Sequence, residues 1–191
     1  MRPSLVLLHG FGEDARMWDD FIPGRFSDST LHIPNYADWS DCISIVAYAQ
    51  KIEETLPQNQ NFILVGHSMG GYIALEIASQ FPERVQKVVM LHSTFVADSE
   101  EKKINRDRTA DLLEKRGTGF FIGPFLPNLF ASVSQELMTT LADRYQTLPA
   151  SGLIAATKAM RDRKDFTSFV QQTAIPFLFI LGEKDALISP E

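Results

Sequence analysis

Residues 62–81 constrain this chain more than any other stretch, because an apolar run, a glycine-rich turn and a helical pattern follow one another without a gap. Residues 62–65 are apolar, short and partly β-branched, which is typical of a buried strand. From 69 to 81 the apolar residues recur at helical spacing, and Pro82 marks the end of that pattern. The turn between them reads Gly66-His67-Ser68-Met69-Gly70-Gly71. We therefore expect a strand, a sharp turn and a helix, with one serine at the tip.

A Gly-x-Ser-x-Gly turn between a strand and a helix is the nucleophile elbow. Gly66 and Gly70 are small because strand and helix must pass close to each other at such a turn. The helix N-terminus behind Ser68 offers unpaired N–H groups and a positive dipole end, which favour nearby negative charge. Acyl transfer needs this arrangement for its oxyanion. Three fixed residues can also match by chance, but the flanking strand and helix favour Ser68 as a nucleophile.

A second buried strand is expected at residues 4–8, and it leads into His9-Gly10-Phe11-Gly12. In the elbow architecture a loop of this kind supplies the other oxyanion donor from a backbone N–H. We expect that donor to be the N–H of Phe11, paired with the N–H of Met69. Taken alone, the segment would be an ordinary glycine-rich turn. His9 is interpreted as a hydrogen-bonded brace of this loop.

Further strands alternate with helices along the first half of the chain, which predicts right-handed crossovers and a mostly parallel sheet with helices on both faces. Ser40 or Asp41 is the expected N-cap of the helix before the central strand. Ligands of such sheets bind beyond the carboxyl ends of the strands, where His9, Ser68 and His92 all fall. The expected strands are 31–34, 85–91 and 175–181, and the expected helices are 14–21 and 42–56.

Two candidate partners of the serine follow strands. His92 could line the pocket or act in catalysis, and the pocket wall is the favoured reading. His67 is adjacent to Ser68, so its side chain points elsewhere and it cannot easily serve as the base. Asp185 lies just past the last expected strand and after the serine, which fits the chain order of serine, acid and histidine. A turn aspartate is the alternative, and Glu183 is the reserve candidate.

Between the core segments 1–94 and 175–191, residues 95–174 are predicted to form an all-helical lid over the strand ends. Asp98 and Glu101 suggest a capping box for a charged helix that ends near Gly117. The aromatic stretch that follows, residues 120–130, either packs as core between the lid and the rest of the protein or lines an apolar substrate pocket. Its candidate pocket residues are Phe120, Phe121 and Phe125. The other lid helices are expected at 134–148, 150–161 and 166–173.

Charge and composition exclude several functional classes. The net charge of −6 and the pI near 5.2 argue against nucleic acid or an anionic membrane as partner. Cys42 is the single cysteine, so no internal disulfide is possible, and a reducing, cytoplasmic location is expected. No signal peptide, metal site or nucleotide site is evident, and no cofactor is expected. The sequence does not indicate an oligomeric state.

These motifs together resemble the α/β-hydrolase superfamily, in its lidded esterase, lactonase and peroxidase-like branch. The resemblance spans nearly the whole chain and is specific for the fold, not for the substrate. It implies Ser68 as nucleophile, Asp185 as the acid of a catalytic triad, and the N–H groups of Phe11 and Met69 as the oxyanion hole. The residues that carry it are His9-Gly10-Phe11-Gly12, Gly66 to Gly71, Ala159-Met160-Arg161-Asp162, Ile175-Pro176 and Gly182-Glu183-Lys184-Asp185.

The sequence departs from this family at one point, since all four histidines precede Asp185. The resemblance places the triad histidine after one more helix and strand, beyond Glu191, and an unassisted serine is a poor nucleophile. We expect an incomplete chain whose sheet lacks its last strand and helix, although a naturally shortened pseudoenzyme is the alternative. The expected activity is hydrolysis of a small carboxylic ester or lactone. The alternatives are a non-catalytic binding module and other reactions of the fold, such as carbon–carbon bond hydrolysis or perhydrolysis.

Overall fold

The computed structural model describes residues 4–185 and 187–188, and it contains one parallel five-stranded sheet. The strand order is β2-β1-β3-β4-β5, and every neighbouring pair is parallel, as predicted. The strands lie at β1 Ser4–Leu8, β2 Thr30–His32, β3 Phe62–His67, β4 Val85–Leu91 and β5 Phe177–Ile180. Because the strands run the same way, their carboxyl ends meet at one edge of the sheet, which is the edge the sequence assigns to the site.

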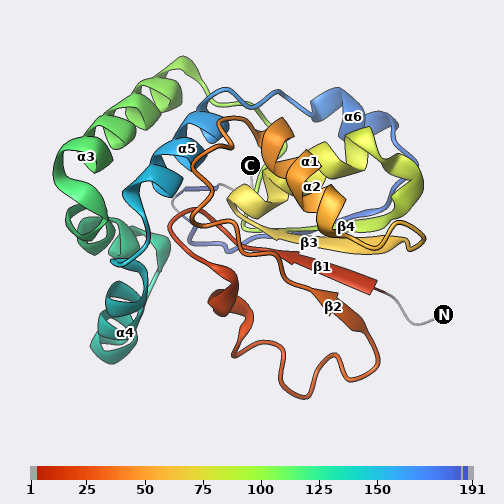
Figure 1. Ribbon diagram of the computed structural model, residues 1–191, viewed down its shortest axis with the longest axis horizontal. Coiled ribbons are helices and arrows are strands. Elements are labelled where there is room, and N and C mark those ends of the chain that lie inside the picture. Colours follow the sequence, from red (N-terminus) through yellow and green to blue (C-terminus); the bar gives the residue numbers. More distant parts are fainter. Residues whose placement is uncertain (1–3, 186, 189–191) are drawn as a thin grey trace.

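Helices α1 and α2 cover one face of the sheet, and α6 lies on the same side (Figure 1). Their bounds are α1 Ile45–Thr55, α2 Met69–Gln80 and α6 Thr167–Gln172. The expected start of the first helix was wrong, because Ser44, and not Ser40 or Asp41, accepts the capping hydrogen bond from the N–H of Ala47. The predicted helix at 14–21 is only a 3₁₀ turn at Ala15–Trp18, capped by Asp14.

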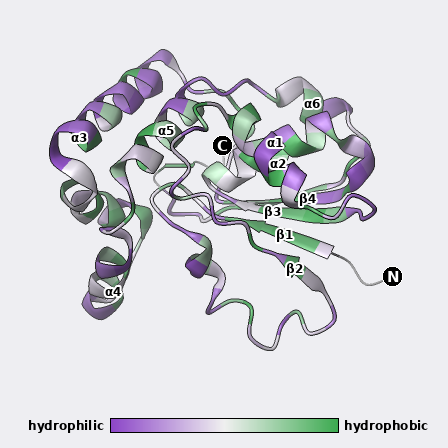
Figure 2. Cartoon of the chain, in the orientation of Figure 1, coloured by the Kyte–Doolittle hydropathy of each residue, from purple (hydrophilic) through white to green (hydrophobic). Residues whose placement is uncertain are grey.

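The hydrophobic core lies between this helical layer and the sheet. Along β3 the residues alternate between buried and half-buried, which is the two-residue period of a strand with one face inward. Helix α2 is buried along nearly its whole length, so its apolar pattern runs all round the helix. Figure 2 shows β1 and β3 mostly in the hydrophobic colour and α3 mostly in the hydrophilic colour. Cys42 is buried in this core, as expected of a small apolar side chain.

The helices α3, α4 and α5 gather beyond the carboxyl ends of the strands (Figure 1). Their bounds are α3 Glu100–Phe125, α4 Gln135–Tyr145 and α5 Ala150–Arg161. We name this helical unit, residues 100–161, the lid. Helix α3 breaks at Gly117, whose φ of 74° is left-handed, and resumes towards Phe125. Glycine adopts this conformation without a steric penalty, so the charged helix ends near Gly117, as predicted, and a second helical segment follows it to Phe125.

The predicted capping box at the start of the lid was wrong. Ser99 is the N-cap of α3, and its hydroxyl accepts from the N–H of Lys102. The Asp98 side chain is 1% exposed and binds two guanidinium groups, those of Arg106 and Arg163. A carboxylate this deeply buried needs cationic partners, and that requirement outweighs a capping role.

β5 forms one edge of the described sheet and leaves apolar side chains uncovered. Leu178 is 55% exposed and Ile180 is 44% exposed, although both belong to a strand. An edge of this kind is normally covered or charged in a folded protein.

The division of the chain into two core segments, 1–94 and 175–191, with a lid at 95–174 stays a prediction.

Candidate active site

Ser68 lies at the sharp turn between β3 and α2, with φ 52° and ψ −116°. A residue with a side chain rarely adopts this backbone region, so the turn stores strain at the serine. Neighbouring hydrogen bonds hold the conformation in place. The Ser68 N–H donates to the carbonyl of Leu91 at 3.0 Å, and its carbonyl accepts from the Ser93 hydroxyl at 2.8 Å. The end of β4 therefore fixes the serine's backbone.

The two glycines that flank Ser68 are required by close packing, as the sequence predicts. A Cβ at Gly66 would lie 2.4 Å from the carbonyl carbon and oxygen of Gly70. A Cβ at Gly70 would lie 2.3 Å from the carbonyl oxygen of Leu8, at the end of β1. Both contacts are with backbone, which cannot move aside as a flexible side chain can. The turn therefore brings α2 against the ends of two strands.

The loop after β1 is braced by His9 and Tyr36. The Tyr36 N–H donates to His9 Nε2 at 3.2 Å, so this ring nitrogen is the acceptor and Nδ1 carries the proton. His9 Nδ1–H then donates to the Gly10 carbonyl at 2.9 Å, and the Tyr36 hydroxyl donates to the His9 carbonyl at 2.6 Å. Burial lowers the pKa of His9 to about 4, which keeps the ring neutral near pH 7. The predicted role of His9 as a loop brace is confirmed.

The same loop is tied to the nucleophile turn by Glu13 and His67. One oxygen of Glu13, Oε2, accepts from the Gly10 N–H at 3.0 Å and lies 2.9 Å from His67 Nδ1. Burial alone would raise the pKa of Glu13, but His67 and the Gly10 N–H bring it below its usual value. Burial alone would lower the pKa of His67, but Glu13 raises it above its usual value. The two side chains form a largely buried ion pair.

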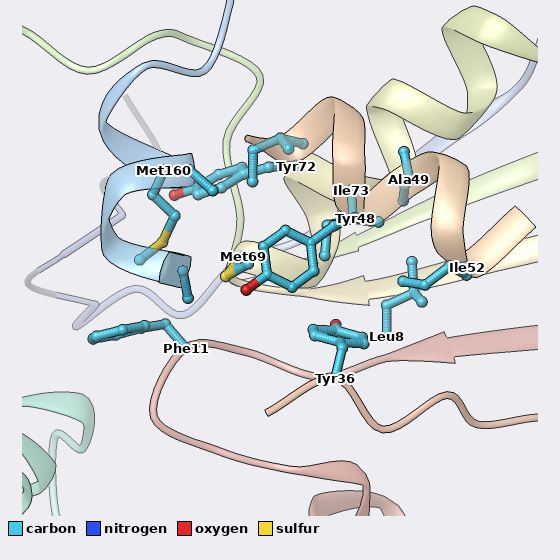
Figure 3. Close-up of a cluster of buried hydrophobic side chains, with 14 of the residues drawn as sticks. Leu8, Phe11, Tyr36, Tyr48, Ala49, Ile52, Met69, Tyr72, Ile73 and Met160 are labelled. Carbon is cyan, nitrogen blue, oxygen red and sulfur yellow. The ribbon is translucent and has the colours of Figure 1, made fainter. Parts of the chain in front are cut away.

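Phe11 is buried beneath the lid. Its ring meets the rings of Phe121 and Phe125 edge-on, at centroid distances of 5.8 and 5.7 Å. Figure 3 draws Phe11 and Met69 in one buried cluster with Met160 of α5. Two sets of contacts therefore fix the backbone of the loop after β1: the packing of Phe11 against the lid and the ion pair between Glu13 and His67.

Asp185 follows β5 and contacts His92, which follows β4. Asp185 Oδ2 lies 2.8 Å from His92 Nδ1, and Oδ1 accepts from the N–H groups of Leu187 and Ile188, each at 2.9 Å. Burial alone would raise the pKa of Asp185, but these hydrogen bonds lower it. An ionised carboxylate only accepts, so His92 Nδ1 carries the proton and Nε2 of the neutral ring is an acceptor. A general base needs this tautomer.

These side chains line one cavity of about 550 Å³ beneath the lid. Of the residues that the sequence singles out, Phe11, Ser68, His92, Phe125 and Asp185 line it. Phe121 is buried against Phe11 and is not among the lining residues. Phe120 points away, because it is 49% exposed and the Arg116 guanidinium lies over its ring.

Sequence reasoning missed Glu13 and the cationic side of the cavity. Glu13 directly follows the glycine-rich segment 9–12 that holds the expected oxyanion donor, and that position was an available signal. Lys102 and Arg106 belong to the helix that the sequence predicts only as charged, and both line the cavity. Within the described residues, no group of three or more His, Cys, Asp or Glu side chains is placed to hold a metal ion.

A protein-family model matches nearly the whole chain. The family model described as alpha/beta hydrolase fold matches residues 3–191. A pimeloyl-[acyl-carrier protein] methyl ester esterase of Klebsiella pneumoniae is 38% identical over 200 residues, which are 96% of this chain and 76% of that protein. The biotin biosynthesis bifunctional protein BioHC of Teredinibacter turnerae is 25% identical over 97% of this chain. The chain spans only 34% of that longer protein.

Solved structures agree on the architecture. A thermophilic esterase from Thermogutta terrifontis, with malate bound, superposes with a TM-score of 0.89 at 25% identity, covering 98% of this chain and 74% of that one. An enol-lactonase from Burkholderia xenovorans superposes with a TM-score of 0.81 at 18% identity, covering 100% of this chain and 76% of that one. The second likeness concerns the fold alone. Among the described helices, none has the length and apolar character needed to cross a bilayer.

Proposed function

Because the chain belongs to the α/β-hydrolase fold family, we propose that it acts as a serine hydrolase that cleaves a small carboxylic ester or lactone through an acyl-enzyme on Ser68. The observation that carries the proposal is the backbone of Ser68, which is held at φ 52° between β3 and α2 at the wall of a cavity. Strain at a turn that presents one hydroxyl to a cavity is characteristic of a nucleophile.

The reaction follows from the groups around the serine. The Ser68 oxygen attacks the ester carbonyl, its proton passes to an imidazole, and a bond forms between Oγ and the carbonyl carbon. The N–H groups of Phe11 and Met69 hold the resulting oxyanion. The ester C–O bond then breaks, and the alcohol leaves with the proton from the imidazolium. Water cleaves the acyl-serine by the same steps and releases the acid.

Asp185 orients the imidazole that takes the proton. Among the described residues, His92 donates its Nδ1–H to Asp185, and this tautomer leaves Nε2 as the nitrogen that would accept the serine proton. His92→Gln identifies which imidazole acts, because a glutamine amide can still donate to Asp185 but cannot accept the serine proton. A fall in kcat supports His92 as the base, whereas an unchanged kcat rules His92 out.

The relatives narrow the substrate to carboxylic esters. Proteins named as esterases resemble this chain in sequence and in fold, and one is named for methyl esters of an acyl carrier protein conjugate. A screen of the full gene product on p-nitrophenyl esters, methyl esters and lactones tests the reaction class. Release of p-nitrophenol that needs Ser68 would support the proposal.

Ser68→Ala is the decisive variant. We expect it to reduce kcat/KM for p-nitrophenyl butyrate by at least about a thousandfold, because the covalent intermediate can no longer form. Ser79→Ala, on the same helix but absent from the cavity lining, is the matched control. Unchanged turnover in Ser68→Ala would refute the assignment. If the parent protein binds esters without turnover, the alternative of a non-catalytic binding module is favoured.

A further inference from the structure

The cavity has a chemical asymmetry that ester hydrolysis alone does not use. The side chains at the strand ends, Ser68, His92 and Asp185, lie in one part of its lining. Helix α3 supplies another part, with four polar residues spaced three, four and seven positions apart, so they share one helical face. These residues are Lys102, Asn105, Arg106 and Thr109.

The wall of the cavity that α3 forms together with the flanking residues Asp98 and Arg163 carries more positive than negative charge. Asp98 is bound by Arg106 Nε at 3.1 Å and by Arg163 Nη1 at 2.8 Å. One carboxylate neutralises only one of these two guanidinium groups. Lys102 adds a third cation on the same helix face. Three cations therefore face one anion on this wall.

Among these cations, Arg163 is buried and held by several contacts, whereas Arg106 and Lys102 on α3 are more exposed. The Arg163 side chain is 5% exposed, donates to the carbonyls of Val96 and Met160, and lies over the ring of Tyr72 at 4.1 Å. The Arg106 side chain is 26% exposed, and Lys102 is an exposed residue. Arg106 and Lys102 are therefore the cations that a ligand in the cavity can reach.

From this charge surplus we infer that the substrate carries an anionic group, and specifically a carboxylate, at the end of the acyl chain remote from the reacting ester. A guanidinium and an ammonium side by side match a carboxylate, and partial burial strengthens the attraction. Apolar side chains of the lining, Phe11, Phe125 and Leu129, would hold the methylene groups between the two ends. The chemical class is the half-ester of a dicarboxylic acid. This inference rests on the proposed function for the position of the ester.

Binding measured without turnover tests the inference separately from catalysis. Ser68→Ala protein is titrated calorimetrically with monomethyl adipate and with methyl hexanoate, which share a six-carbon acyl chain and differ in the terminal carboxylate. We expect the half-ester to bind at least about tenfold more tightly, which is a typical worth of one charge-assisted hydrogen bond. Added salt should reduce that preference. The series from succinate to suberate half-esters then locates the best chain length.

Two variants assign the effect to α3. Lys102→Met and Arg106→Met each remove one cation while Arg163 still pairs with Asp98. Each substitution should lower the affinity for the half-ester several-fold and leave the affinity for methyl hexanoate unchanged. Lys103→Met is the matched control, because Lys103 is next in sequence, pairs with Glu100 and is absent from the cavity lining. Equal affinity for the two esters, or equal losses in all three variants, would overturn the inference. Failure of ester turnover with a preserved half-ester preference would overturn only the proposed function.

Discussion

Glu13→Gln separates the charge of the Glu13–His67 pair from its hydrogen bonds. A glutamine amide oxygen in the place of Oε2 can still accept from the Gly10 N–H and from a neutral His67 ring. What disappears is the attraction between a carboxylate and an imidazolium. Hydrogen bonds to charged groups contribute about 1.5–3 kcal/mol and neutral ones about 0.5–1.5 kcal/mol, so the substitution should cost about 1.5 kcal/mol of unfolding free energy near pH 6.

The pH dependence gives the sharper test. The raised pKa of His67 means that its contribution is complete below its unfolded pKa of about 6.5 and is lost as the pH rises through the folded value. The lowered pKa of Glu13 means that its contribution is complete above its unfolded pKa of about 4.3 and is lost as the pH falls through the folded value. Asp185 also favours the charged His67 ring. The cost of Glu13→Gln should therefore be largest between about pH 5 and 6.5.

Urea unfolding followed by tryptophan fluorescence measures this cost from pH 5.5 to pH 9. Above the folded pKa of His67, the parent protein holds a buried carboxylate without a cationic partner, so the difference should vanish or reverse sign. Glu54→Gln removes an exposed carboxylate from α1 and is the control for general charge effects. A cost of Glu13→Gln that is the same at pH 6 and pH 9 would refute an ion pair as its source.

Two further substitutions test the nucleophile turn. Gly70→Ala should destabilise the fold by about 3 kcal/mol or more, because its Cβ would meet the backbone of Leu8, whereas Gly119→Ala, with open space around it, should be neutral or stabilising by up to about 1 kcal/mol. Differential scanning calorimetry of the two variants checks this, and equal melting temperatures would contradict it. Ser68→Gly should be more stable than Ser68→Ala by about 1 kcal/mol, because glycine relieves the left-handed strain. At Ser79 in the body of α2 the order should be reversed, and the same order at both positions in urea unfolding would argue against strain at Ser68.

The sequence was sufficient wherever a local pattern has one structural solution. Alternating apolar runs and helical periods predicted a parallel sheet, and the Gly-x-Ser-x-Gly turn predicted Ser68 at a strand end, because such patterns depend on contacts between near neighbours. Element boundaries were less secure. The helix start at Ser44 competed with two other good caps a few residues earlier, and local propensity does not choose among them.

Contacts between distant segments were decided only by the tertiary structure. His92 and Asp185 are 93 positions apart, and His67 and Glu13 are 54 apart. Lys102 and Arg106 have the pattern of a solvated helix face, and only the docking of α3 over the strand ends turns that face towards a cavity. Periodicity along the chain reports which side of an element is apolar, but it carries no information about what packs against the polar side. The sequence alone therefore determined the fold and the serine, whereas the packing of the lid determined which charges surround it.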